Sequence, residues 1–90
     1  MYELGRAYVL KENDAKAEEV FHQLASTSKD STYVAKAYIE LGSLSRNQSQ
    51  FNQALGYYKM VVEQMPLSGY AEDALAAIES IYQTKNEPQE

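Results

Sequence analysis

Few side chains in this sequence are placed where they could do acid–base or metal chemistry. His22 is the only histidine, and histidine works in catalysis or metal binding only with convergent partners, so a structural or solvated role is expected. Glu18 and Glu19 are adjacent, so they diverge around a helix and cannot act on one substrate. Glu72 and Asp73 are adjacent as well, in a first helical turn where negative charge is favourable. The sequence therefore predicts no catalytic site, no metal site and no bound cofactor.

The composition describes a folded, acidic chain. Its 90 residues are 44% hydrophobic, which is enough for one small packed core. A formal net charge of −5 argues against nucleic-acid binding, because phosphate contacts need clustered Lys and Arg. The chain has no Cys, which excludes disulfides and thiolate metal sites but leaves the compartment open. The longest apolar run, 74–78, is far too short for direct membrane insertion, and the chain does not open like a signal peptide.

Helical periodicity runs through most of the chain, and no stretch alternates like a half-buried strand. Polar breaks separate the apolar stripes: the tripeptide 12–14 offers one N-cap, Ser49 offers another, and Pro66 ends a helix. Five helices are predicted, at residues 2–11, 14–27, 32–46, 50–65 and 70–83. The segment 85–90 has no apolar anchor and is expected to fray.

The apolar stripes repeat along the chain with a period of 37 residues. Under this shift the tripeptide 3–5 falls on the identical tripeptide 40–42, and Phe21 falls on Tyr58. The matches lie on the packing stripes, whereas most polar positions differ. This pattern favours stacked helical hairpins, each unit packing on the next, over a closed helical bundle.

The repeated residues resemble the tetratricopeptide repeat, a helix–turn–helix unit of about 34 residues with the pattern W-x2-L-G-x2-Y, then A-x3-F, then P. At the pattern positions the first unit has Met1, Leu4, Gly5, Tyr8, Ala17 and Phe21. The second unit has Tyr38, Leu41, Gly42, Ser45, Ala54, Tyr58 and Pro66. A partial third unit keeps Leu75, Ile78 and Tyr82, with Glu79 in place of the glycine. Two departures stand out, since Ser45 replaces a large aromatic residue and Lys29 replaces the first unit's proline.

This resemblance implies an all-α fold, a right-handed α-solenoid of helix–turn–helix hairpins with two units and one extra helix. The domain would span residues 1–84, with units at about 1–30, 31–67 and 68–84, the last one partial, followed by the tail 85–90. Read in this way, the chain is expected to be a fragment of a longer repeat protein.

The resemblance implies packing roles for the glycines of the pattern and for the residues that face them. Gly5 and Gly42 would let the partner helix of each hairpin approach closely, with the small residues Ala17 and Ala54 facing them. The aromatic residues Phe21 and Tyr58 would fill the space between adjacent hairpins. Four of the eight tyrosines occupy repeat core positions and are expected to pack: Tyr8, Tyr38, Tyr58 and Tyr82. Two more, Tyr33 and Tyr70, stand at helix entries and are expected between hairpins, which leaves Tyr2 and Tyr57 freer.

In this family the first helices of successive hairpins line a concave groove that binds a protein or peptide partner. The rows beside the packing stripe predict a partner-binding face made of Tyr2, Arg6, Val9, Ile39, Ser43, Arg46, Ala76, Ser80 and Gln83. Arg6 and Arg46 would be its cations, and Val9 and Ile39 its apolar contacts. A family variant grips C-terminal carboxylates with clustered Lys and Asn on this surface, and these rows lack that cluster. Capture of a chain terminus is therefore not expected.

Three interpretations of function stay open. The first is a protein–protein interaction module that binds a partner on the concave face, and the second is a structural spacer in a longer solenoid. The third is a small helical enzyme or regulator domain with a Tyr/Glu site. Apolar stripes on the two terminal helices also predict a homodimer or end-to-end stacking.

The spacing hints at a subfamily and a location. The turn between hairpins is about three residues longer than usual for the family, and Ser31, Tyr33 and Ala37 recur one period later. Both features resemble the repeats of bacterial envelope proteins. The resemblance favours a periplasmic or envelope-associated location, and a cytoplasmic location stays open.

Overall fold

The computed structural model describes residues 2–66 and 68–84, and every regular element in these ranges is an α-helix. The helices are α1 (Tyr2–Leu10), α2 (Asp14–Thr27), α3 (Ser31–Asn47), α4 (Phe51–Gln64) and α5 (Gly69–Thr84). The predicted all-α fold with five helices is confirmed, and each predicted helix end lies within one residue of the observed end. The expected fraying of 85–90 concerns residues outside the described ranges.

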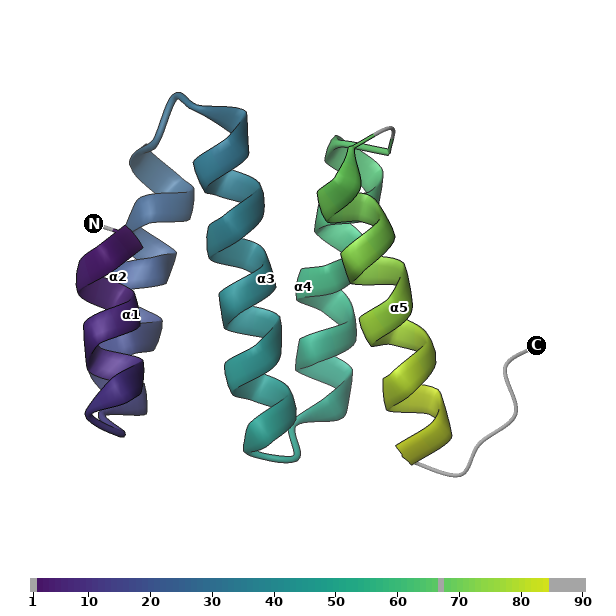
Figure 1. The fold of residues 1–90 in the computed structure, drawn as a ribbon, viewed down its shortest axis with the longest axis horizontal. Helices are drawn as coiled ribbons and strands as arrows, with labels where there is room; N and C mark the ends of the chain where they lie inside the picture. Colours follow the sequence, from purple (N-terminus) through teal and green to yellow (C-terminus); the bar gives the residue numbers. More distant parts are fainter. Residues whose placement is uncertain (1, 67, 85–90) are drawn as a thin grey trace.

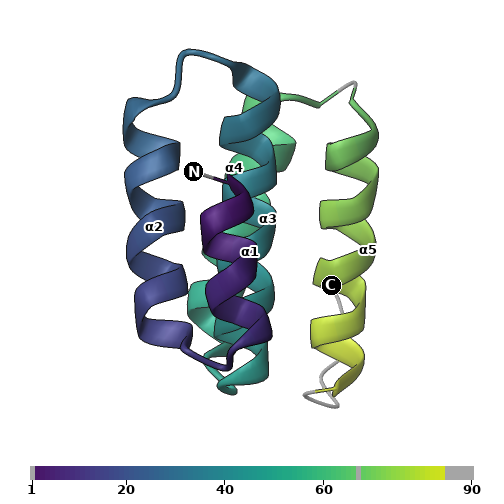
Figure 2. The ribbon, with the colours of Figure 1, turned by 60° about the vertical axis from the view of Figure 1, so that its left-hand side comes forward.

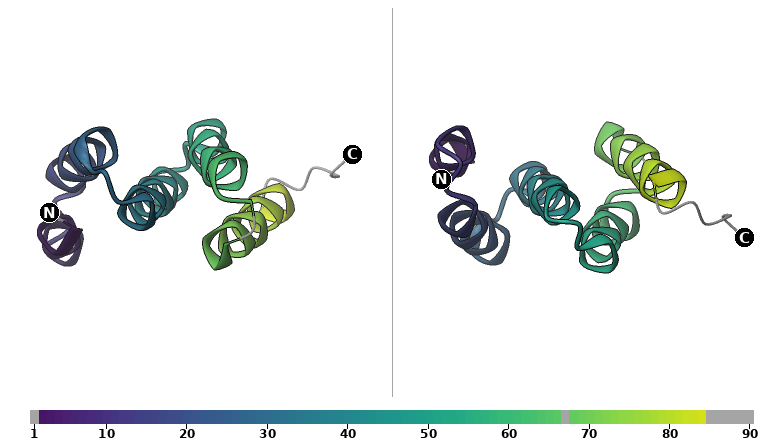
Figure 3. Two further views of the ribbon diagram at one scale, coloured as in Figure 1. Left: turned by 90° about the horizontal axis from the view of Figure 1, so that it is seen from above. Right: turned by 90° about the horizontal axis from the view of Figure 1, so that it is seen from below.

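The helices run up and down and form two layers. Figure 3 shows α1, α3 and α5 on one side and α2 and α4 on the other, so the chain zigzags between the layers. We call the layer of α1, α3 and α5 the first-helix layer, and the layer of α2 and α4 the second-helix layer. Consecutive helices pack against each other, and α3 also touches α1 and α5 within its own layer (Figures 1 and 2). The result is a row of stacked hairpins with extents of 36 × 30 × 16 Å.

The two hairpin turns have the same geometry. Glu12 and Ser49, one repeat period apart, both adopt the left-handed region, with φ of 60° and 62°. The amide N–H of the following residue then donates back to a carbonyl of the first helix, Asn13 to Tyr8 at 2.9 Å. Gln50 donates to the equivalent carbonyl at 2.8 Å. The 37-residue period therefore extends to the backbone of the turns.

The starts of the two helices of the second-helix layer differ: α2 has a side-chain N-cap and α4 has none. The Asn13 side chain accepts from the backbone N–H of Lys16, as an N-cap residue does. The prediction that Ser49 caps the fourth helix is wrong, because Ser49 takes the left-handed turn position and α4 begins after Gln50 without a side-chain cap. Pro66 stands just beyond the end of α4, where a proline no longer interrupts the helical hydrogen bonds.

Two apolar clusters hold the stack together. The first joins α2 and α3 through the buried residues Ala17, Phe21, Leu24, Ala37, Leu41 and Leu44. The second joins α3, α4 and α5 through Ala35, Ala54, Leu55, Tyr58, Val61, Ala74, Ile78 and Ile81. Tyr38 packs against both clusters. The helix α3 therefore contributes to both clusters, which lie on its two sides.

Close contacts at the two pattern glycines fix the spacing inside each hairpin. A Cβ atom added at Gly5 would lie 2.5 Å from Cε1 of Phe21, and one at Gly42 would lie 2.7 Å from Cζ of Tyr58. The predicted close approach at these glycines is confirmed, and the aromatic rings supply the nearest atoms. In the second unit Ser45 stands where the pattern has an aromatic residue. It is buried, and its Oγ has no hydrogen-bond partner among the described residues.

Candidate functional site

The predicted partner-binding residues are distributed over all three helices of the first-helix layer. Three of them are exposed and accessible for contact: Arg6, Ala76 and Gln83. The others are half-buried: Tyr2, Val9, Ile39, Ser43, Arg46 and Ser80. The two expected apolar contacts have packing roles, because Val9 lies against the first cluster and Ile39 against the second. The face is consequently more polar than the sequence suggested.

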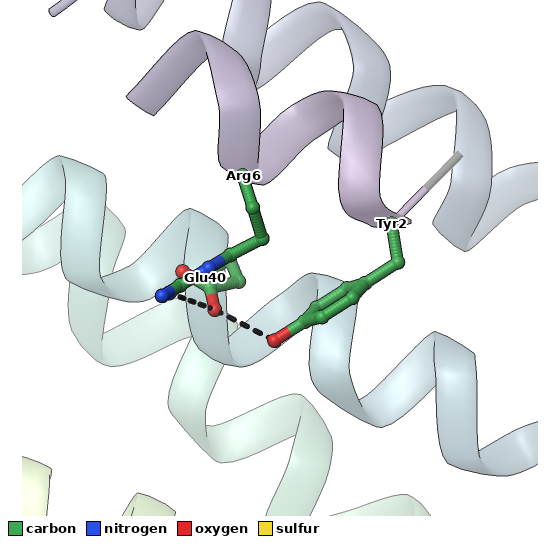
Figure 4. Close-up of polar contacts among 3 residues, drawn as sticks. All are labelled: Tyr2, Arg6 and Glu40. Atoms are coloured by element: carbon green, nitrogen blue, oxygen red, sulfur yellow. Dashed lines mark hydrogen bonds and ion pairs between the residues drawn. The ribbon is translucent and has the colours of Figure 1, made fainter. Parts of the chain in front are cut away.

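Glu40 of α3 joins two of these residues. One of its carboxylate oxygens, Oε2, accepts a hydrogen bond from the Tyr2 hydroxyl at 3.0 Å and pairs with the Arg6 guanidinium at 2.9 Å (Figure 4). The Glu40 side chain is only 14% exposed, whereas that of Arg6 is 50% exposed. Arg6 is thus a paired cation rather than a free one, and it keeps half of its surface available to a partner.

Two tyrosine hydroxyls, Tyr2 in α1 and Tyr58 in α4, are harder to ionise than usual and have a raised pKa. Burial raises the pKa of Tyr2, and the hydrogen bond to the Glu40 carboxylate raises this pKa further. Burial also raises the pKa of Tyr58, while the positive charge of Arg46 opposes that rise. The raised pKa of Tyr2 means that its hydroxyl stays protonated, and can donate to Glu40, up to a higher pH than a free phenol would.

The second-helix layer has its own polar contact. The Tyr57 hydroxyl of α4 and Nε2 of His22 in α2 are 2.9 Å apart, and their rings meet edge to face. Tyr57 also accepts from the Gln53 amide at 3.3 Å and stacks on Tyr38. Tyr57 is therefore less free than the sequence suggested. The contact links neighbouring hairpins, and the single histidine has a structural partner.

The described part of the chain holds neither a cluster of metal-ligating side chains nor a helix that could cross a membrane. Within 2–66 and 68–84, no three His, Asp or Glu side chains gather as they would around a metal ion. None of the described helices combines the length and apolar character that crossing a bilayer requires. Two polar side-chain contacts connect neighbouring hairpins, Tyr2 and Arg6 with Glu40, and His22 with Tyr57.

Glu40 is the site residue that sequence reasoning missed, and the repeat period contains the signal for it. The partners Tyr2 and Arg6 lie 38 and 34 residues before it. His22 and Tyr57 are 35 residues apart. Polar pairs separated by about one period belong to neighbouring helices of the same layer, so complementary residues at this spacing are candidates for contact.

Comparison with models of protein families matches the first part of the chain. The family model for the tetratricopeptide repeat matches residues 1–32, which include α1, α2 and the start of α3. Neither the curated proteins nor the solved structures yield a match to this chain. The family match supports the resemblance for the first hairpin. Repeats of this family typically serve as non-catalytic modules for protein interaction.

Proposed function

We propose that the whole chain is a tetratricopeptide-type scaffold that binds a peptide or protein partner on its first-helix layer and catalyses no reaction. The observation that carries this proposal is the side-by-side placement of α1 and α3, joined on the surface by Tyr2, Arg6 and Glu40. The family match at 1–32 supports the type of repeat, and the second hairpin repeats the first in helix order, turn conformation and glycine–ring packing.

The binding face suits a partner that makes polar contacts over two hairpins. Arg6 is half exposed and held by Glu40, so its unused donors point to a fixed place without further loss of side-chain entropy. Arg46 of α3 and Gln83 of α5 extend the polar row across the layer. A scaffold of this kind recognises its partner by shape and by a few placed donors.

Selection from a random peptide library tests this function. Peptides captured by the wild-type chain should be released when Arg6 and Arg46 are both replaced by Ala. A matched control replaces Lys59 and Lys16, two exposed lysines of the second-helix layer, by Ala, and this variant should retain capture. The contribution of Ile39 to capture is tested separately with the small truncation Ile39→Val, because Ile39 packs against the second cluster. If the arginine variant stays folded by circular dichroism and binds as well as wild type, the proposed face is wrong.

Exposed leucines at both ends of the stack support a second proposal, that further helices cover these ends in end-to-end assembly or within a longer array. Leu4 of α1 and Leu75 of α5 are each 50% exposed. The residue one period after Leu4 is Leu41, which is fully buried against the preceding hairpin. Leu4 therefore occupies a position that, in the next unit, a neighbouring helix covers.

Light scattering over a range of protein concentrations tests the association of this chain with itself. The wild-type chain should form dimers or short stacks as its concentration rises, and Leu4→Gln combined with Leu75→Gln should stay monomeric. A monomer at all concentrations for the wild type would contradict self-association. The envelope-associated location remains a proposal that rests on the spacing of the repeats.

A further inference from the structure

Two tyrosine rings near the start of the first-helix layer hold a cation of the chain itself. The rings of Tyr2 in α1 and Tyr33 in α3 have their centroids 6.3 Å apart, at an angle of 52°. The ammonium nitrogen of Lys36 lies 5.2 Å from the first centroid and 5.3 Å from the second. Both distances are within the roughly 6 Å range of a cation–π contact. The ring pair therefore has the geometry to hold a positive charge.

The ring pair is open to solvent. A cavity of about 580 Å³ is lined by Tyr2, Glu3, Leu24, Tyr33 and Lys36. Tyr33 is 43% exposed, so its ring can be reached from outside. The Leu24 side chain provides an apolar wall and Glu3 provides a carboxylate. An aromatic pair, an apolar wall and one acidic group form a set of contacts suited to a long basic side chain.

The orientation of the first ring is fixed before any ligand arrives. The Tyr2 hydroxyl donates to Glu40, and Glu40 is in turn held by Arg6. The Tyr2 ring also lies 6.1 Å from the ring of buried Phe21. A cation that binds over the rings of Tyr2 and Tyr33, as the Lys36 ammonium does, therefore meets one ring whose orientation is already fixed. This lowers the entropic cost of binding.

Charge selects the class of ligand. The chain carries a formal charge of −5, which attracts basic partners and repels acidic ones. Close to the rings, the carboxylate of Glu3 can pair with an incoming cation. Lys36 makes no salt bridge within the described residues, so it can leave the rings without breaking an ion pair.

We infer that the Tyr2–Tyr33 ring pair is a binding site for an arginine side chain of a peptide partner, and that Lys36 occupies this site in the free protein. The inference rests on the proposed function and assigns part of its specificity. A guanidinium suits the site better than the resident ammonium, because its planar group stacks on tyrosine rings and its fork of donors can pair with the carboxylate of Glu3. The partner displaces Lys36 into solvent as it binds.

The site is tested by nuclear magnetic resonance titration with N-acetyl-arginine amide as the probe. The neutral isostere N-acetyl-citrulline amide and the acidic N-acetyl-glutamate amide serve as comparison ligands. The arginine probe should shift the amide signals of Tyr33 and Lys36 in a saturable way, with weaker binding of citrulline and no binding of glutamate. Tyr33→Leu should abolish the arginine response while the helical signal by circular dichroism is retained.

Lys36→Met is the decisive variant, because it keeps a long apolar stem and removes the competing ammonium. It should tighten arginine binding by about two- to fivefold, the range expected for one exposed cation–π contact. Lys59→Met removes the same charge from an exposed position in α4 and should leave the affinity unchanged. If Lys36→Met binds arginine no better than Lys59→Met, Lys36 is not the occupant of the site.

The outcomes separate this inference from the proposed function. Equal binding of arginine and citrulline, or preferential binding of glutamate, would overturn the arginine site. Library peptides that depend on Arg6 and Arg46 but contain no arginine would support the scaffold function and overturn this inference. If the wild-type chain captures no library peptide but still binds N-acetyl-arginine amide, the proposed function is overturned, and the ring pair remains a site for small free cations.

Discussion

The substitution Gly5→Ala places a methyl group where the Phe21 ring already lies. The added Cβ would be 2.5 Å from one ring carbon and 2.6 Å from another, whereas unstrained carbon atoms sit about 3.5–4.0 Å apart. Phe21 is 0% exposed and packs in the first cluster, so its ring has no free space into which it can retreat. The two helices of the hairpin must therefore move apart, or the ring must leave its packed position.

Two opposing effects set the magnitude. Overpacking of this kind costs about 1–3 kcal/mol, and replacing a helical glycine by alanine returns about 1 kcal/mol. Gly56 in α4 is the matched control, because nothing lies within 4 Å of a Cβ added there. Gly56→Ala should therefore gain only the stability, about 1 kcal/mol, that comes from replacing a helical glycine by alanine. The two variants should thus differ in free energy of unfolding by about 1–3 kcal/mol, which corresponds to at least roughly 4 °C in Tm for a domain of this size.

Thermal and urea unfolding followed by circular dichroism measure this difference. We expect the order of stability Gly56→Ala, wild type, Gly5→Ala, from highest to lowest. Phe21→Leu lowers stability by leaving a cavity, but it also removes the ring atoms that the added methyl group would meet. The cost of Gly5→Ala should therefore shrink in that background. A Gly5→Ala variant as stable as Gly56→Ala, or a cost unaffected by Phe21→Leu, would refute the account of close helix approach.

Three further substitutions test other features of the structure. Ser45→Ala removes a buried hydroxyl that has no hydrogen-bond partner among the described residues and should raise the free energy of unfolding by about 1 kcal/mol. Ser80→Ala, in a half-buried helical position, should raise it by only about 0.5 kcal/mol, and chemical denaturation compares the two variants. Glu40→Gln removes the ion pair with Arg6 and should lower the free energy of unfolding by less than about 1 kcal/mol. This loss should be smaller at 1 M NaCl, where the Debye length is about 3 Å. A loss that is the same at 1 M NaCl would contradict a charge effect. Burial raises the pKa of Tyr58, so its contribution to stability is full below the unfolded pKa of about 10 and is lost as pH rises through the raised folded pKa. Between pH of about 9 and about 11, the Tm of Tyr58→Phe should therefore fall less than the Tm of the wild type. Parallel curves of Tm against pH for the two proteins would show that ionisation of this phenol does not affect stability.

The helices were predictable because their signals are local and repeated. The apolar stripe, the polar breaks and Pro66 placed every helix end within one residue, and the 37-residue shift predicted the stacking of hairpins. Ser49 was misassigned because serine favours N-caps on average, whereas this turn needs a left-handed residue at that position. The equivalence of Ser49 with Glu12, a poor N-cap residue, was the available clue.

The site was only partly predictable because it depends on side-chain direction across helices. The rows of the repeat placed Tyr2 and Arg6 on the first-helix layer, but which residue of α3 meets them depends on the offset between neighbouring helices. That offset brings Glu40 to them instead of Ile39 or Ser43. Lys36 and Tyr33 escaped notice for a similar reason, since they reach Tyr2 from the start of α3.

The position of α3 has a consequence for how the molecule opens. Among the described helices, α3 contacts each of the other four, whereas each of the others contacts only two, and α1 and α5 stand at the ends of the stack. In a linear stack, unfolding can start at either end and spread inward at the cost of one interface at a time. Amide protons of α3 should therefore exchange with solvent most slowly, and those of α1 and α5 most quickly. The tyrosine pair and the Glu40 contact both join α1 to α3, so a bound partner would slow exchange in α1 and extend the cooperative unit toward that end.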